Sequence, residues 1–240
     1  MKKFLFLLFL VPALAPASED GIALDAAPVR TDALSLQDGA RTFVNYCLNC
    51  HGAASMRYNR LQDLGLSETE IKDNLMFASA KIGETMKVPL TMKDGREWFG
   101  VAPPDLSVIA RARGADWLYT YLRSFYRDQV RPTGWNNTAF PNVGMPHVLY
   151  ELQGQRGLKV EKIAEHGRQT EKASFVQLTQ GTLTAAGYDE AVANLVGFLV
   201  YVGEPNAAER KRLGIYVLFV LLLLTVLTWL LKREFWKDVH

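Results

Sequence analysis

The stretch YCLNCHG, residues 46–52, holds the two cysteines of this 240-residue chain, three positions apart and followed at once by a histidine. Three kinds of site share this cysteine spacing: a structural metal site, a redox-active dithiol and a haem attachment site. A zinc site needs four protein ligands, and the sequence has no second Cys/His pair at ligand spacing. A thioredoxin-like dithiol needs a strand before its first cysteine, whereas the residues before Cys47 have helical spacing.

The histidine favours the third kind of site. Residues three apart lie on one face of a helical turn, so the thiols of Cys47 and Cys50 can both add to the vinyl groups on one edge of a porphyrin. His51 then faces the iron. The pattern therefore predicts one covalently bound haem c per chain, in preference to a structural disulfide.

An export signal precedes this motif. Lys2 and Lys3 are followed by a short apolar run, residues 4–15, and Ala15 and Ala17 offer small residues for cleavage. An uncleaved anchor is the alternative, but the run is too short and too interrupted by Pro and Ala to span a bilayer comfortably. We expect a signal peptide over residues 1–17 and a mature chain outside the cytoplasm, where haem attachment takes place.

A second apolar run lies near the carboxyl end. Residues 213–231 carry no charge, and as a helix they would reach about 28 Å, close to the thickness of a hydrocarbon core. Basic residues flank the run on both sides, so the signal peptide, and not the charge bias, orients it. We expect a periplasmic haem c domain over residues 18–208, a single-pass anchor over 209–232 in a bacterial inner membrane and a cytoplasmic tail over 233–240.

Charge excludes one class of partner. The chain has a formal net charge of +2, but its basic residues gather at the signal and around the span, which leaves the exported part mildly acidic. Such a domain would not bind nucleic acid, and it could dock a basic soluble protein, although a weak charge of this kind is more often only solvated surface.

The exported part has the pattern of a mainly α single domain with long loops. Ser35 is a plausible N-cap for a helix over residues 36–50, Ser67 opens a capping box, and Asp105 and Asp116 can cap two short helices. A last amphipathic helix is expected over 188–202, before Pro205. Residues 85–101 and 131–146 are expected as loops, and residues 159–163 and 174–178 as a minor hairpin.

The second axial ligand would decide between electron transfer and open-site chemistry. Among six methionines, Met145 stands in PNVGMPH, where Gly144 permits close backbone approach and Pro146 fixes φ. The thioether could thus be held rigidly against a haem edge, with core packing as the plain alternative. Other candidates are Met86, Met92, His147 and His166, although a lone loop histidine is more often a surface group.

Four segments together resemble the cytochrome c1 family, the haem c subunits of the bacterial quinol:cytochrome c oxidoreductase, or cytochrome bc1 complex. They are YCLNCHG, APPDLSVIARARGADWLYTYLRSFYRD, NNTAFPNVGMPHVL and YDEAVANLVGFLVYVGEP, followed by the single span. The resemblance implies that Cys47 and Cys50 form the thioether bonds, that His51 is the proximal ligand and that Met145 is the distal ligand.

The resemblance extends to residues around the haem. It implies that the turn ending at Pro104 presents a carbonyl to the free nitrogen of His51, and that Arg113 pairs with a haem propionate. Trp117 and Phe140 correspond to aromatic residues of the haem wall, for which ordinary core packing is the alternative.

The implied function is electron transfer. The haem would take electrons from the Rieske iron–sulfur protein and pass them to a soluble or membrane-bound cytochrome c, while quinol is oxidised on the cytochrome b subunit of a dimeric complex. The chain would then belong to an enzyme as its electron carrier, without a substrate-converting site of its own. The alternatives are a free-standing membrane-tethered cytochrome c shuttle and, with an open distal site, a haem enzyme or gas sensor.

Overall fold

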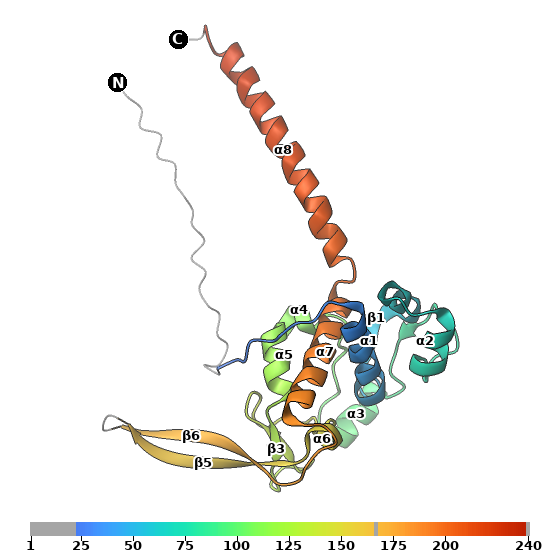
Figure 1. Ribbon diagram of the computed structural model, residues 1–240, viewed down its shortest axis with the longest axis vertical. Coiled ribbons are helices and arrows are strands. Elements are labelled where there is room, and N and C mark those ends of the chain that lie inside the picture. Colours follow the sequence, from blue (N-terminus) through green and yellow to red (C-terminus); the bar gives the residue numbers. More distant parts are fainter. Residues whose placement is uncertain (1–22, 166–167, 239–240) are drawn as a thin grey trace.

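The computed structural model describes residues 23–165 and 168–238, so the expected signal peptide and His166 lie outside the described residues. One mainly helical domain is followed by a single long helix that extends away from it, and a β-hairpin projects from the opposite end of the domain (Figure 1). The expectation of a mainly α domain with long loops and one carboxyl-terminal membrane helix is confirmed.

Helical elements alternate with short strands along the chain. The helical elements are α1 (Ala33–Thr42), η2 (Phe43–Cys47), η3 (Tyr58–Leu64), α2 (Glu68–Leu75), α3 (Met92–Phe99), α4 (Ile109–Arg113), α5 (Ala115–Leu122), α6 (Tyr150–Gln153), α7 (Ala185–Gly203) and α8 (Ala207–Phe235). The strands are β1 (Ala53–Arg57), β2 (Thr85–Met86), β3 (Phe125–Arg127), β4 (Trp135–Asn137), β5 (Arg156–Glu165) and β6 (Arg168–Gln177). Within the described residues they pair as three separate two-stranded antiparallel sheets, β1 with β2, β3 with β4 and β5 with β6.

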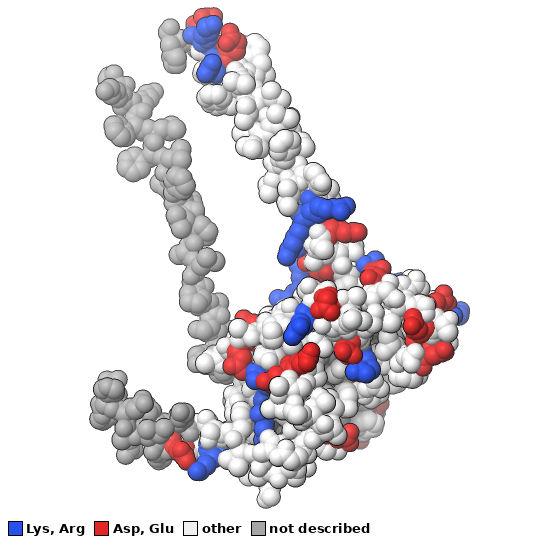
Figure 2. All heavy atoms as spheres, in the orientation of Figure 1, with Lys and Arg blue, Asp and Glu red and all other residues white. Residues whose placement is uncertain are grey.

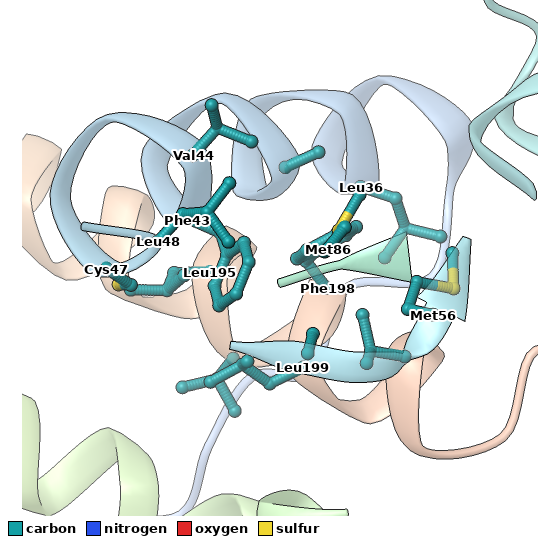
Figure 3. Packing of buried hydrophobic residues seen from close by; sticks show 14 of the residues in the cluster. Leu36, Phe43, Val44, Cys47, Leu48, Met56, Met86, Leu195, Phe198 and Leu199 are labelled. Atoms are coloured by element: carbon teal, nitrogen blue, oxygen red, sulfur yellow. The ribbon is translucent and has the colours of Figure 1, made fainter. Parts of the chain in front are cut away.

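The core lies between α1 and α7, two helices far apart in the sequence. Gly39 lets them approach closely, because a Cβ at this position would stand 2.2 Å from the carbonyl oxygen of Asn194. One turn further on, the rings of Phe43 and Phe198 lie 5.6 Å apart between centroids. Figure 3 shows the packed side chains of this cluster, with Cys47 at one end of it. The amphipathic helix expected over residues 188–202 lies within α7, and its apolar stripe is buried in the same core.

The first helix starts earlier than expected and ends in an unusual turn. Asp32, and not Ser35, is its N-cap, and the Asp32 carboxylate accepts a hydrogen bond from the Ser35 amide at 3.0 Å. The helix continues into η2, a π-helical turn in which the amide of Leu48 bonds to the carbonyl of Phe43. Such turns often occur at functional sites, and this one places Cys47 at its end.

Three local expectations fail for identifiable reasons. Residues 85–101 are not a loop throughout, because Thr91 caps α3 by accepting from the Asp94 amide at 3.1 Å. Asp105 does not cap a helix, since its carboxylate accepts from the amides of Ala54 and Ser107. Asp116 lies in the first turn of α5 and accepts from the amide of Ala27. Both carboxylates are thus bound in part by segments remote in sequence.

Two other local expectations are confirmed. Ser67 and Glu70 form both bonds of the capping box that opens α2. The β5–β6 hairpin exists, with Lys159 opposite Ser174, but it is longer than expected, because each strand has 10 residues.

The expected membrane anchor, residues 209–232, lies within α8. This helix has 29 residues, and its large apolar side chains from Leu213 to Leu231 are exposed. Figure 2 shows uncharged atoms along its middle and basic side chains at both ends. Length and composition therefore suit a bilayer-spanning segment.

Candidate functional site

An apolar cavity of 330 Å³ opens between the end of η2, the start of α5 and the segments around residues 99–104 and 140–146. All eight residues expected at the site line this cavity: Cys47, Cys50, His51, Pro104, Arg113, Trp117, Phe140 and Met145. They come from four separate stretches of the chain, so the fold gathers them in one place. Leu195 and Leu199 of α7 line it from the core side.

The two cysteines lie at the cavity wall and form no disulfide with each other. Cys47 is buried, and burial raises the pKa of its thiol to about 12. Cys50 is partly exposed, and burial raises the pKa of its thiol as well. The amides of Cys50 and His51 both bond to the carbonyl of Cys47, at 3.0 and 2.8 Å. This tight turn keeps the two thiols and the imidazole on the same side of the backbone, where they line one cavity.

His51 has a fixed tautomer. Its Nδ1 lies 2.7 Å from the carbonyl oxygen of Pro104, and because a carbonyl can only accept, Nδ1 carries the proton. The lone pair is thus left on Nε2, the nitrogen that can bind a metal. Burial lowers the pKa of the imidazole, while the Pro104 bond and the nearby Asp105 carboxylate act in the opposite direction. The neutral, ligating form is therefore favoured at physiological pH.

The loop carrying Met145 is held by two buried asparagines. Asn137 Oδ1 accepts from the amides of Ala139 and Phe140, and Asn136 Oδ1 accepts from the amide of Asn142 at 2.8 Å. Asn142 itself has a φ of 63°, a left-handed conformation that asparagine tolerates. These bonds define the path of residues 138–146, the candidate ligand loop.

Gly144 lets the loop pack closely against residues 99–101. A Cβ there would lie 2.9 Å from a Val101 methyl group and 3.1 Å from the carbonyl oxygen of Phe99. The loop can therefore press against the 99–101 segment and bring the Met145 side chain into the cavity wall.

An aromatic group forms another part of the wall. Trp117 stacks on Tyr121 with centroids 4.8 Å apart and an interplanar angle of 10°, and Phe140 meets Trp117 edge-on at 6.4 Å. The hydroxyl of Tyr121 lies 3.4 Å from the Sδ of Met145. Tyr121 is not among the residues expected at the site, and in the sequence only its spacing four residues after Trp117 hints at a shared face.

Three of the other candidate ligands, Met86, Met92 and His147, lie elsewhere. Met86 is fully buried in the core, and Met92 is 65% exposed on α3. His147 is not a surface group as expected, since its ring stacks on Phe125 at 4.9 Å and its Nε2 lies 2.8 Å from Gln153 Oε1. None of these three lines the cavity.

Arg113 lies at the mouth of the cavity. Its guanidinium carbon is 5.1 Å from the ring centroid of Trp117, and its side chain is exposed. Arg111, two residues earlier, points elsewhere and pairs with Glu204 at 3.9 Å. Of the two arginines, Arg113 is the one that lines the cavity.

The donor set and the walls suit haem c. Two free thiols, an imidazole with its lone pair on Nε2 and a thioether all line one cavity, whose walls are otherwise almost entirely apolar. A porphyrin needs apolar walls for its faces, thiols for its vinyl groups and soft or imidazole ligands for its iron. The fold and the site together define a membrane-anchored c-type cytochrome.

Comparison with known proteins gives the family. A model described as the Cytochrome C1 family matches residues 79–239. Over 242 residues the chain is 50% identical to a protein of Nitrosomonas europaea named ammonia monooxygenase gamma subunit, with 100% of this chain and 99% of the relative covered. It is 45% identical over 244 residues, covering both chains fully, to cytochrome c1 of Allochromatium vinosum, and 27% identical over 270 residues, covering 94% of this chain and 92% of the relative, to cytochrome c1 of Rhodospirillum rubrum.

The chain belongs to the cytochrome c1 family. It carries a covalently bound haem c and is a haem-carrying electron-transfer subunit of the cytochrome bc1 complex. The expectation drawn from the sequence resemblance is confirmed at this level.

Proposed function

We propose that this chain takes electrons one at a time from the Rieske iron–sulfur protein and passes them to a soluble or membrane-bound c-type cytochrome. The observation that carries the proposal is that His51 and Met145 line the same apolar cavity as the two free thiols. An imidazole and a thioether together fill both axial positions of a haem iron, which favours electron transfer over ligand binding.

Each residue of the site has a part in this proposal. Cys47 and Cys50 would hold the haem through thioether bonds, and His51 and Met145 would be the ligands of its iron. The carbonyl of Pro104 keeps the His51 lone pair on Nε2. When bound, haem c supplies reversible one-electron chemistry.

The cavity wall completes the assignment. Trp117 and Phe140 exclude water from the haem face, and Arg113 pairs with a propionate at the cavity mouth. Water exclusion and a nearby cation both favour the ferrous form, which carries one positive charge less.

No proton-transfer group or nucleophile is required of this chain. Quinol would be oxidised on the cytochrome b subunit, so that the chain serves the ubiquinol:cytochrome c reductase as its electron carrier. We place the complex in a bacterial inner membrane as a dimer, with α8 packed against cytochrome b. The exposed apolar surface of α8 supports a role as anchor.

The proposed topology follows the sequence. Residues 1–17 would be removed as a signal peptide, residues 18–208 would form the periplasmic haem domain, residues 209–232 would span the membrane and residues 233–240 would remain in the cytoplasm. Basic side chains lie at both ends of α8, so the export signal is the feature that supports this orientation.

Similarity to the Nitrosomonas europaea protein suggests a second candidate. That relative is named as a subunit of ammonia monooxygenase, so a role of this chain as electron carrier for a monooxygenase assembly is the second candidate. The tethered cytochrome c shuttle is the third candidate. All three share the haem site and differ in the proteins around α8.

The experiment is gentle purification of the protein from its native membranes through a carboxyl-terminal tag, followed by a reduced-minus-oxidised spectrum. Co-purification of b-type haem in stoichiometric amount, reducible by added quinol, supports the proposal. Association with an ammonia-oxidising protein in place of b-type haem would support the second candidate. A c-type spectrum alone, in detergent that keeps other membrane complexes intact, would support the shuttle.

A further inference from the structure

Tyr121 is the polar neighbour of the Met145 sulfur. Its hydroxyl lies 3.4 Å from Sδ, a distance within the range of hydrogen bonds to sulfur. A thioether has no hydrogen to give, so the hydroxyl is the donor. Tyr121 and Met145 both line the cavity, one from α5 and the other from the ligand loop.

The phenol ring is held in this position from several sides. Trp117 stacks on one face at 4.8 Å, and Phe125 meets the ring edge-on at 5.1 Å. At the backbone, Asn137 Nδ2 donates to the carbonyl of Tyr121 at 2.8 Å, which ties α5 to the start of the ligand loop. The hydroxyl therefore points at Met145 because both the ring and the loop are fixed.

We propose that Tyr121 is a positioning residue that raises the reduction potential of the haem by donating a hydrogen bond to the ligand sulfur of Met145. Donation to sulfur withdraws electron density from the thioether, which makes it a weaker donor to iron. The ferric form depends more on that donation than the ferrous form, so the reduced state is favoured. This inference rests on the proposed role of Met145 as axial ligand.

The test compares two tyrosine-to-phenylalanine variants in the purified holoprotein. Tyr121→Phe removes the hydroxyl and keeps the ring stacking. The thioether loses its hydrogen-bond donor, but thioether sulfur is a weak acceptor, so we expect the protein to fold without this bond. Tyr201→Phe removes a hydroxyl that bonds to the carbonyl of Arg60 at 2.9 Å, outside the cavity lining. We expect a lower midpoint potential and a shifted methionine-to-ferric-iron charge-transfer band for Tyr121→Phe, and neither change for Tyr201→Phe.

The inference is overturned if Tyr121→Phe leaves both the potential and the band unchanged, or if both variants shift them equally. A second pair of variants asks whether the effect passes through sulfur. In a Met145→His background, where an imidazole replaces the thioether, the effect of Tyr121→Phe should disappear. An equal shift in that background would mean that Tyr121 acts through the polarity of the cavity, which contradicts the proposal.

The same variants separate failure of this inference from failure of the ligand assignment. If Met145→His alone leaves the spectrum and potential as in the parent, Met145 is not the ligand and both proposals fail. If Met145→His changes the spectrum while Tyr121→Phe has no effect, Met145 is still the ligand and only the proposed effect of the Tyr121 hydrogen bond on the potential is contradicted.

Discussion

The guanidinium carbon of Arg113 lies 5.1 Å from the ring centroid of Trp117, so the arginine is held over an aromatic wall of the cavity. Cation–π contacts of this kind stabilise a side chain by roughly 0.5–1 kcal/mol at exposed sites. The contact orients the charge toward the cavity mouth, where an acidic edge of the haem is expected. A positive charge in that place favours the less positive, ferrous state.

We therefore predict that Arg113→Gln lowers the reduction potential. The loss of one partly screened charge should cost on the order of 1 kcal/mol, which is roughly 40 mV for a one-electron couple. Redox titration of the purified protein measures it. Arg111→Gln is the matched control, because Arg111 pairs with Glu204 and does not line the cavity. Equal reduction potentials in Arg113→Gln and the parent would mean that the charge of Arg113 has no effect on the haem.

A second prediction concerns the distal ligand. Met145→Ala should open a coordination position, so that the reduced protein binds carbon monoxide and its potential falls. The control is Met92→Ala, which removes a thioether that is 65% exposed and outside the cavity lining, and it should change neither property. Carbon monoxide binding by the parent protein, unchanged in Met145→Ala, would instead support an open distal site.

The sequence predicted the site better than the local elements. The eight expected residues could be named because a covalent attachment motif and three further segments of this chain together resemble the cytochrome c1 family. All eight line one cavity. Tyr121 was missed, since the direction of its hydroxyl depends on how α5 packs against the ligand loop. Nothing within the sequence of α5 specifies that neighbour.

The wrong caps have a similar cause. A carboxylate before a helix can bind the amides of its own turn or amides from elsewhere, and only the tertiary structure decides. Asp105 and Asp116 are bound by Ala54 and Ala27, respectively, from segments that lie at least 50 residues away. By contrast, Ser67 and Glu70 satisfy each other locally, and that cap was predicted correctly.

A third prediction tests the helix contact that supports the site. Gly39→Ala would place a Cβ 2.2 Å from the carbonyl oxygen of Asn194, a backbone atom that cannot swing away. Separating α1 from α7 should lower the free energy of unfolding by about 1–3 kcal/mol or more. Chemical denaturation of the purified protein measures this.

Gly214→Ala is the matched control for this variant. Gly214 lies in α8, and a Cβ there meets nothing within 4 Å, so the substitution should leave stability unchanged or slightly raised. If Gly39→Ala were as stable as the parent, the close packing of α1 on α7 would be contradicted.

The last prediction concerns acid stability of α2. The Glu70 carboxylate accepts from the amide and hydroxyl of Ser67, at 2.8 and 2.7 Å, and these bonds hold the pKa of Glu70 below its usual value of 4.5. The folded state therefore binds a proton less readily than the unfolded state. The stabilising effect of the ionised Glu70 carboxylate is complete above the pKa of the unfolded state and is lost as the pH falls through the lower pKa of the folded state.

Glu70→Gln should thus destabilise the protein at pH 7 and have a smaller effect as the pH falls from 4.5 through the lower pKa of the folded state, because the parent carboxylate then becomes neutral, like the glutamine side chain. Denaturation curves of both proteins between pH 7 and pH 3 measure the difference. Glu68→Gln serves as the control: Glu68 lies in the same turn but pairs with Lys72 and takes no part in the cap, so its effect should weaken with added salt. A difference between Glu70→Gln and the parent that stays constant down to pH 3 would mean that the ionised carboxylate contributes nothing to the cap.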